Sequence, residues 1–153
     1  LKFQAEEKMY TKTNKITEAY LNIPLYAPSV SIENTHYTEI LNNNKDFLTL
    51  YKKGKYTASK YSVIYVRPNG QGFNRFGITA GKKVGNSVKR NRAKRLIRLA
   101  YSKAEVRLPI GMDIVIVARK AICEIKSQEY CGYMEKYGVP EIIRMFGSFN
   151  VKK

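Results

Sequence analysis

The residues with the clearest chemical character form one cationic stretch in the middle of the chain. Its eight cations are Lys82, Lys83, Lys89, Arg90, Arg92, Lys94, Arg95 and Arg98, and no carboxylate stands among them. Much of the stretch has the composition of a helix, on which like charges three or four residues apart cost about 0.2–0.5 kcal/mol per pair. An anionic partner would offset this repulsion, so the stretch predicts an anion-binding surface.

Side chains suited to metal binding or nucleophilic catalysis are sparse. Cys123 and Cys131 stand eight residues apart and His36 is the only histidine, so no metal site is expected. We interpret the cysteines as reduced structural thiols and His36 as a surface residue. The only aspartates, Asp46 and Asp113, are far apart in the chain, and only proximity in the fold could make them a metal-binding pair.

Charge is distributed unevenly along the chain, whose net charge is +16. Residues 1–36 carry four lysines and four glutamates, whereas residues 37–103 carry sixteen basic and two acidic side chains. We therefore expect a neutral N-terminal extension over residues 1–36, poorly ordered or loosely docked, and a polyanion-binding domain over residues 37–153. No apolar run reaches the length of a membrane span and no signal peptide is visible, so a cytoplasmic protein without a membrane association is expected.

The hydrophobic pattern predicts helices and strands within that one domain. The expected strands cover residues 56–68, 73–81 and 112–118, and the expected helices cover 37–53, 87–104 and 127–137. The first helix should become regular near Lys45, and the last should end at Gly138 and Pro140, before a turn at 141–146. The strand at 112–118 is mostly apolar, which indicates burial on both faces. It forms a βαβ unit with the strand and helix before it.

The helix expected at 87–104 has two unlike sides. Its apolar stripe consists of Ala93, Leu96, Ile97 and Ala100, and the opposite side carries Arg90, Asn91, Lys94, Arg95 and Arg98. The first side should therefore pack on the core while the second binds the anion. Phe47 and Tyr51 share one face of the first helix, and the pattern alone favours core positions for both.

The cationic helix and the loop before it resemble the signature of the bacterial ribonuclease P protein subunit. The resemblance rests on Lys82-Lys83-Val84-Gly85-Asn86-Ser87-Val88 and on Arg90-Asn91-Arg92-Ala93-Lys94-Arg95-Leu96-Ile97-Arg98. It extends in order over roughly residues 37–137, and residues 1–36 have no counterpart. It implies a two-layer α+β fold, αβββαβα, with a mixed four-stranded sheet and a left-handed βαβ crossover, against the usual handedness.

The resemblance also implies a subunit that binds RNA without cleaving it. The catalytic groups and the divalent metal, Mg²⁺, would belong to the ribonuclease P RNA, and the protein would hold no cofactor, metal or catalytic residue. The residues that match the family's RNA-contacting motif would contact that RNA. They are Lys82, Lys83, Asn86, Arg90, Asn91, Arg92, Lys94, Arg95 and Arg98. A cleft for the single-stranded 5′ leader of precursor tRNA corresponds to Phe47, Tyr51, Val63, Tyr65, Arg119 and Lys120. The resemblance thus moves Phe47 and Tyr51 from core to cleft.

Two other hypotheses are compatible with the basic composition. The first is a ribosomal or rRNA-associated protein, which would use the same phosphate chemistry on another RNA. The second is a membrane-surface protein with a basic amphipathic helix. The narrow apolar stripe, half of it alanine, argues against the membrane.

Overall fold

The computed structural model describes residues 38–150, so the expected extension over residues 1–36, including His36, lies outside the described residues. The elements are β1 (Thr38–Ile40), α1 (Asn44–Lys53), β2 (Lys55–Ala58), β3 (Ser62–Pro68), β4 (Asn74–Thr79), α2 (Ser87–Ala104), η3 (Glu105–Arg107), β5 (Met112–Ala118), η4 (Lys120–Glu124), α3 (Ser127–Tyr133), η5 (Met134–Gly138) and α4 (Val139–Asn150). The α+β class is confirmed, as is the regular start of the first helix. There the Asn43 side chain accepts a hydrogen bond of 2.8 Å from the Lys45 N–H.

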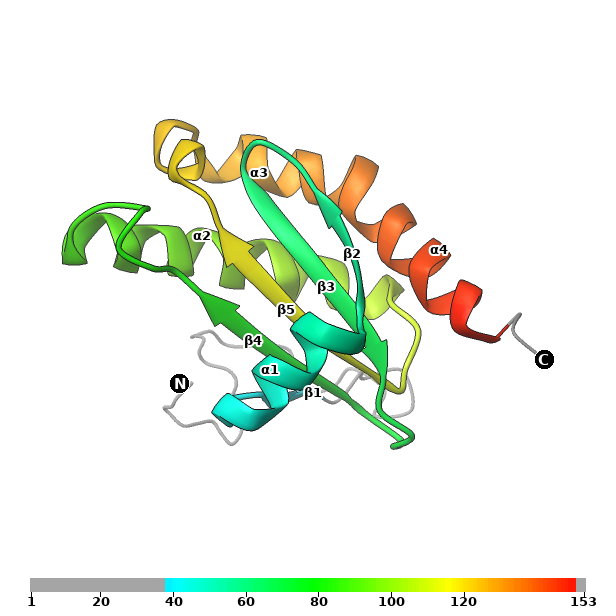
Figure 1. Cartoon of the computed structure of the whole chain (residues 1–153). Helices are drawn as coiled ribbons and strands as arrows, with labels where there is room; N and C mark the ends of the chain where they lie inside the picture. The colour runs from blue at the N-terminus through cyan, green and yellow to red at the C-terminus, as the bar shows by residue number, and fades with distance from the viewer. Residues whose placement is uncertain (1–37, 151–153) are drawn as a thin grey trace, which may run out of the picture. The chain divides into compact units, whose positions relative to one another are not determined.

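The strands form one mixed sheet in the order β1-β4-β5-β3-β2 (Figure 1). β4 runs parallel to β5 and β1, whereas β3 runs antiparallel to β5 and β2. The expected count of four strands is wrong, because residues 38–40 form a short strand beside β4 and not the start of a helix. The single strand expected over residues 56–68 is also wrong, since the chain turns after Ala58 and pairs back on itself as a hairpin.

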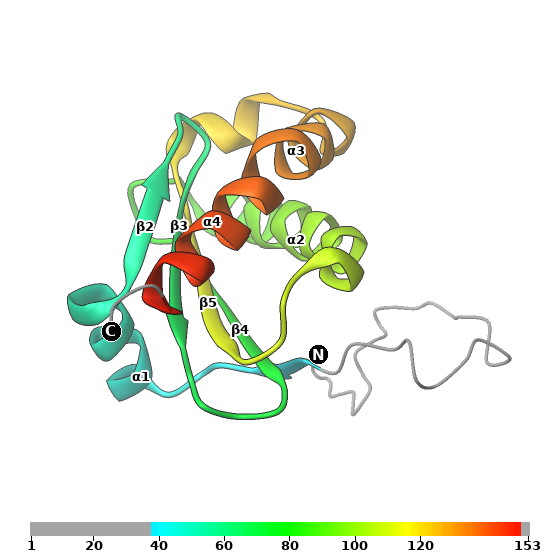
Figure 2. The same cartoon turned by 90° about the vertical axis from the view of Figure 1, so that its right-hand side faces the viewer.

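The two faces of the sheet are covered differently (Figures 1 and 2). One face, including Ile64 and Ile116, is buried beneath α2, α3 and α4. The stripe predicted from the sequence, Ala93, Leu96, Ile97 and Ala100 of α2, packs there together with Tyr101 and Ala104. On the other face, α1 is the one helix of residues 38–150 that packs, and there Leu50 and Val115 are buried while Phe47 and Tyr65 remain partly exposed. β5 is therefore covered on both sides, as its apolar sequence predicts.

The helix α2 connects the neighbouring parallel strands β4 and β5. In Figure 1 both strands run toward the upper left, β5 lies to the upper right of β4, and α2 passes behind the sheet. This arrangement is a left-handed crossover, in agreement with the expectation from the family resemblance and opposite to the usual hand.

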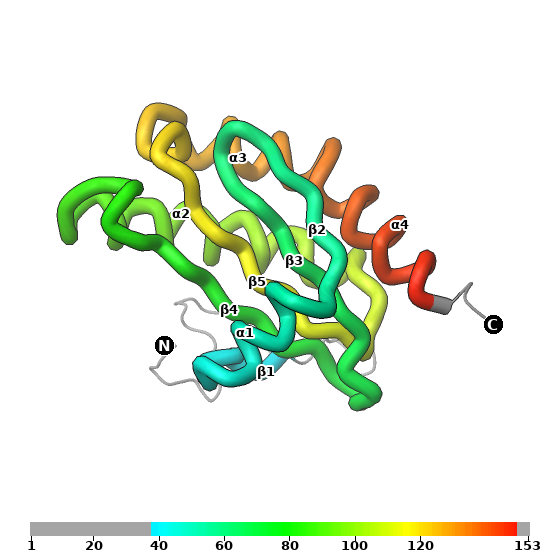
Figure 3. The backbone as a smooth tube through the Cα atoms, viewed as in Figure 1, coloured from blue at the N-terminus to red at the C-terminus, as the bar shows by residue number. Residues whose placement is uncertain are grey.

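The C-terminal helical segment does not end at Gly138 and Pro140, so that prediction and the turn expected at 141–146 are wrong. α3 continues through the π-helical turn η5 into α4 (Figure 3). Pro140 has no N–H to donate, and its ring would crowd the carbonyl of the preceding turn in a regular α-helix. A wider π-helical turn directly before the proline relieves that conflict, so the helix passes it.

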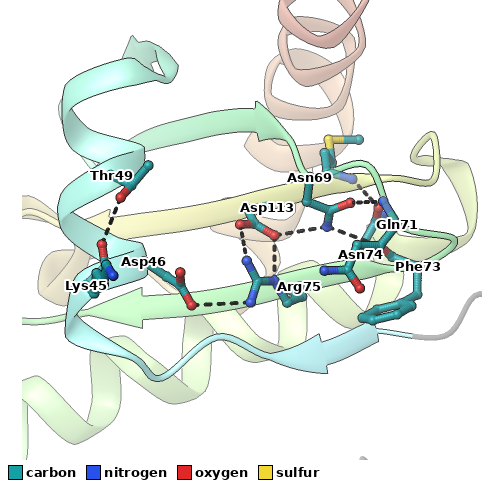
Figure 4. A network of polar contacts seen from close by, with 10 residues as sticks. Lys45, Asp46, Thr49, Asn69, Gln71, Phe73, Asn74, Arg75 and Asp113 are labelled. Carbon is teal, nitrogen blue, oxygen red and sulfur yellow. Dashed lines mark hydrogen bonds and ion pairs between the residues drawn. The ribbon is translucent and has the colours of Figure 1, made fainter.

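A partly buried ion cluster joins α1, β4 and β5 (Figure 4). The Arg75 guanidinium donates to both Asp113 carboxylate oxygens at 2.8 and 2.7 Å and reaches the Asp46 carboxylate at 3.2 Å. The Asn69 amide donates to Asp113 at 2.9 Å. Asp113 is 5% exposed, and its hydrogen bonds raise the pKa of the Arg75 guanidinium further above its ordinary value. The two distant aspartates thus meet in the fold, but around an arginine.

Replacing Arg75 by methionine should lower the free energy of unfolding by about 2–3 kcal/mol, because Asp113 would stay buried without its cation. Urea denaturation measures the loss. Arg144→Met is the matched control, since its pair with Glu141 lies exposed on one helix and should contribute little. Equally small losses in the two variants would show that the ion cluster does not stabilise the fold.

Candidate nucleic-acid interface

The loop from β4 to α2 places the first cations of the predicted site. The side chains of Lys82 and Lys83 are exposed, while Val84 between the loop and the helix is buried and anchors them. Asn86 is the N-cap, and its side-chain oxygen accepts a 3.0 Å hydrogen bond from the Lys89 N–H. The structure therefore gives Asn86 a structural task, and its side-chain amide N–H groups remain for an RNA contact.

The cationic side of α2 divides into two flanks. Arg90, Asn91 and Lys94 line an open concavity of about 310 Å³ together with Ala80 and Ser87. Arg95 and Arg98 are exposed. The flank that carries Arg90, Asn91 and Lys94 adjoins the end of β4, so the helix presents cations beside the sheet as well as to solvent.

Arg92, another predicted contact, has its guanidinium bonded within the protein. Its Nη1 donates to the Cys123 carbonyl at 3.2 Å and its Nη2 to the Ile125 carbonyl at 3.0 Å. Arg92 therefore ties the segment after β5 to α2. No local pattern predicts this contact, since it joins residues about thirty positions apart.

The aromatic residues of the predicted leader cleft lie together on the α1 face of the sheet. The rings of Phe47 and Tyr51 stack at 6.4 Å, and Tyr51 meets Tyr65 edge-on at 4.9 Å. The Tyr51 hydroxyl lies 3.2 Å from Thr79 Oγ1 on β4. None of the three rings is fully buried, so the core positions favoured by the helical pattern alone do not apply to Phe47 and Tyr51.

Tyr56 extends this row and was missed by the sequence analysis. It pairs with Tyr65 across β2 and β3, with ring centroids 5.5 Å apart, and is 62% exposed. The break of residues 56–68 into a hairpin places it there, and a turn signal at Ser59-Lys60 was the available clue. We define the aromatic row as Phe47, Tyr51, Tyr65 and Tyr56.

The strand backbone beneath the aromatic row leaves room for its rings. A Cβ atom on Gly77 of β4 would lie 2.6 Å from Cε1 of Phe47, so only glycine lets that ring approach the strand. Val63, also predicted for the cleft, is partly exposed beside Val117 on the same face.

Two further predicted cations follow the end of β5. Arg119 and Lys120 are both exposed. The Arg119 Nη1 donates to the Ser59 carbonyl at 3.1 Å and its backbone N–H to the Tyr61 carbonyl at 2.9 Å, which attaches them to the β2–β3 turn. Because β4 and β5 are parallel, this pair lies at the same end of the sheet as the loop that carries Lys82 and Lys83.

The arrangement offers two kinds of contact: cations for phosphates and exposed rings for unpaired bases. A metal site has little support in the described residues 38–150. No group of three His, Cys, Asp or Glu side chains comes together there, and both aspartates face Arg75. Within the same residues, no helix is long and apolar enough to cross a membrane.

Comparison with known proteins agrees with the geometry. The family model described as Ribonuclease P matches residues 36–138. The ribonuclease P protein component of Alkaliphilus oremlandii is 43% identical over 89 residues, which cover 58% of this chain and 78% of the relative. That of Lachnoclostridium phytofermentans is 50% identical over 82 residues, covering 54% and 71%.

Solved structures show the same fold. The Staphylococcus aureus RNase P protein aligns with a TM-score of 0.61 at 30% identity, covering 70% of this chain and 96% of that protein. The Thermotoga maritima RNase P protein aligns with a TM-score of 0.60 at 29% identity, covering 69% and 96%. These relatives favour the resemblance seen in the cationic motif over the ribosomal alternative. With a family model matched over most of its length and the fold shared as well, the chain belongs to the ribonuclease P protein family.

Proposed function

We propose that this protein is the RNA-binding subunit of ribonuclease P and promotes 5′ maturation of precursor tRNA. Two separate surfaces support the proposal: the cations of α2 and its preceding loop, and the aromatic row on the α1 face. The first suits the phosphates of the catalytic RNA, and the second suits the single-stranded 5′ leader. The presence of both on one small domain is the observation that carries the proposal.

The cationic surface acts through phosphate neutralisation. Arg90 and Lys94 stand on a helix whose opposite side is buried, so their backbone is already ordered before RNA binds. Each phosphate that they neutralise releases counterions, which makes binding strongly dependent on salt. The self-repulsion of the helix, unfavourable in the free protein, is relieved in the complex.

The aromatic row acts through stacking. Unpaired bases gain about 1–3 kcal/mol each on an exposed aromatic ring, largely without regard to sequence. Arg119 and Lys120 at the end of β5 add phosphate contacts at the end of the sheet where α2 begins. An extended strand across this face would therefore lead toward the RNA bound at α2.

The protein's part in the reaction is binding and placement. Mg²⁺ would supply charge stabilisation and an activated water at the scissile phosphate. The two aspartates do not fit such an ion, because Asp46 and Asp113 are engaged with Arg75. We therefore assign the metal and the cleavage step to the RNA subunit and no catalytic residue to the protein. The thiols of Cys123 and Cys131 are unpaired, which fits a cytoplasmic protein.

The double variant Arg90→Ala, Lys94→Ala should bind ribonuclease P RNA more weakly, because two phosphate contacts are lost. For the same reason the slope of the logarithm of the binding constant against the logarithm of the salt concentration should become shallower by about one to two units. Filter binding over a salt series measures the slope. The control variant Lys136→Ala, Arg144→Ala removes the same charge from the exposed side of the C-terminal helical segment. An equal change in both variants would mean that only net charge matters, and the α2 site would be rejected.

Tyr65→Ala should weaken holoenzyme binding to leader-bearing precursor tRNA by roughly fivefold to a hundredfold, the equivalent of one stacking contact, and leave mature tRNA unaffected. Equilibrium binding of the two RNAs gives the ratio. Tyr65→Phe retains the ring and should keep the preference, and Tyr137→Ala removes an exposed ring from the opposite side of the sheet. Equal losses for both RNAs would refute a leader site on the aromatic row.

A further inference from the structure

A second groove lies on the other flank of α2, where α3 begins. It has a volume of about 440 Å³ and is lined by Arg92, Arg95, Leu96, Leu99, Lys126, Ser127 and Gln128. Three of these seven residues are cations and none is acidic. None of them lines the concavity formed by Arg90, Asn91 and Lys94, so α2 has two basic hollows, one on each flank.

The groove is built on a fixed framework. Arg92 bonds to the carbonyls of Cys123 and Ile125, which holds the segment leading to Lys126 against α2. The Lys126 backbone N–H donates to the Glu129 carboxylate at 3.3 Å, which fixes the start of α3. Leu96 is buried in the core and forms part of the floor. The cations of Arg95 and Lys126 are exposed above this framework.

Lys126 is a poor choice for the stability of the fold. It occupies the N-cap position of α3, where Ser, Thr, Asp or Asn normally accepts a backbone hydrogen bond, and a lysine side chain cannot accept one. A cation there also faces the positive end of the helix dipole. Glu129 compensates in part, but it does not line the groove. An anion held between Lys126 and Arg95 would offset the unfavourable charge that Glu129 leaves uncompensated.

The lining indicates the chemistry of that anion. Ser127 and Gln128 add neutral hydrogen-bonding groups beside the cations, as needed for phosphate oxygens and ribose hydroxyls. No aromatic ring lines the groove, so it offers unpaired bases nothing to stack on. α2 and α3 cover one face of the sheet and the aromatic row occupies the other (Figure 2). A leader strand on the row therefore lies across the sheet from this groove.

We propose that the α2–α3 groove is a second site for RNA backbone and binds a segment of the ribonuclease P RNA separate from the one contacted by Arg90 and Lys94. Arg95 and Lys126 contact the phosphates, and Arg92 acts as a positioning residue. The inference rests on the proposed function. It extends the RNA-binding surface onto α3, beyond the motif that carries the family resemblance.

The test uses the full chain with ribonuclease P RNA and the variant Lys126→Thr, which removes the cation and supplies an ordinary cap. Its thermal stability should be retained or raised. Its RNA affinity should fall roughly threefold to tenfold at fixed salt, and the salt dependence should flatten by about one unit. Lys126→Arg should bind normally. Combined with Arg90→Ala, the two effects should multiply, since the hollows are separate.

Unchanged affinity and salt dependence in Lys126→Thr, with a loss in Arg90→Ala, would overturn the second site and leave the proposed function intact. A loss of leader preference without a loss of RNA affinity would also overturn it, because the groove would then serve the substrate. If neither the unaltered chain nor Arg90→Ala binds the RNA, the proposed function itself fails, and that outcome is distinct from the first two.

Discussion

The guanidinium of Arg75 holds together the helix and strands that carry the proposed binding surface. It lies between the carboxylates of Asp113 on β5 and Asp46 on α1, so one cation links α1 to the centre of the sheet. Phe47 follows Asp46 directly, and its ring rests on Gly77 of β4. The placement of the aromatic row therefore depends on a partly buried ion cluster beneath α1.

The same sheet separates two tasks. Its helix-covered face holds α2 by an apolar stripe, which leaves the opposite side of that helix free to be almost wholly cationic. Its other face is covered by α1 and, within the part of the chain that the structure describes, keeps tyrosines partly exposed. Charge repulsion on α2 and exposed rings on the sheet both work against the stability of the free protein. Both features are accounted for by an RNA partner that offsets them.

Much of this could be predicted from sequence because it is local. The packing stripe of α2 and the doubly buried β5 follow from spacing and residue type within single elements. The features that were missed depend on pairing across the chain. β1 has three residues and exists only because β4 accepts it as an edge, and Tyr56 joins the aromatic row only after the hairpin forms.

Other features could not follow from local patterns either. Arg92 has the sequence context of an RNA contact, yet its donors are bonded to carbonyls of a segment that the fold brings near. Pro140 normally predicts a helix end, and a π-helical turn removes the conflict. The left-handed crossover came only from the family resemblance, because handedness leaves no trace in hydrophobic periodicity.

The central claim is that this protein binds and positions RNA while the RNA subunit cleaves. The most direct measurement is precursor tRNA processing at low Mg²⁺ by the RNA alone, by rigorously RNA-free protein, and by both together. We expect slow or no cleavage by the RNA alone, none by the protein at any metal concentration, and efficient cleavage at the mature 5′ end by the mixture. Processing by the RNA-free protein would contradict it.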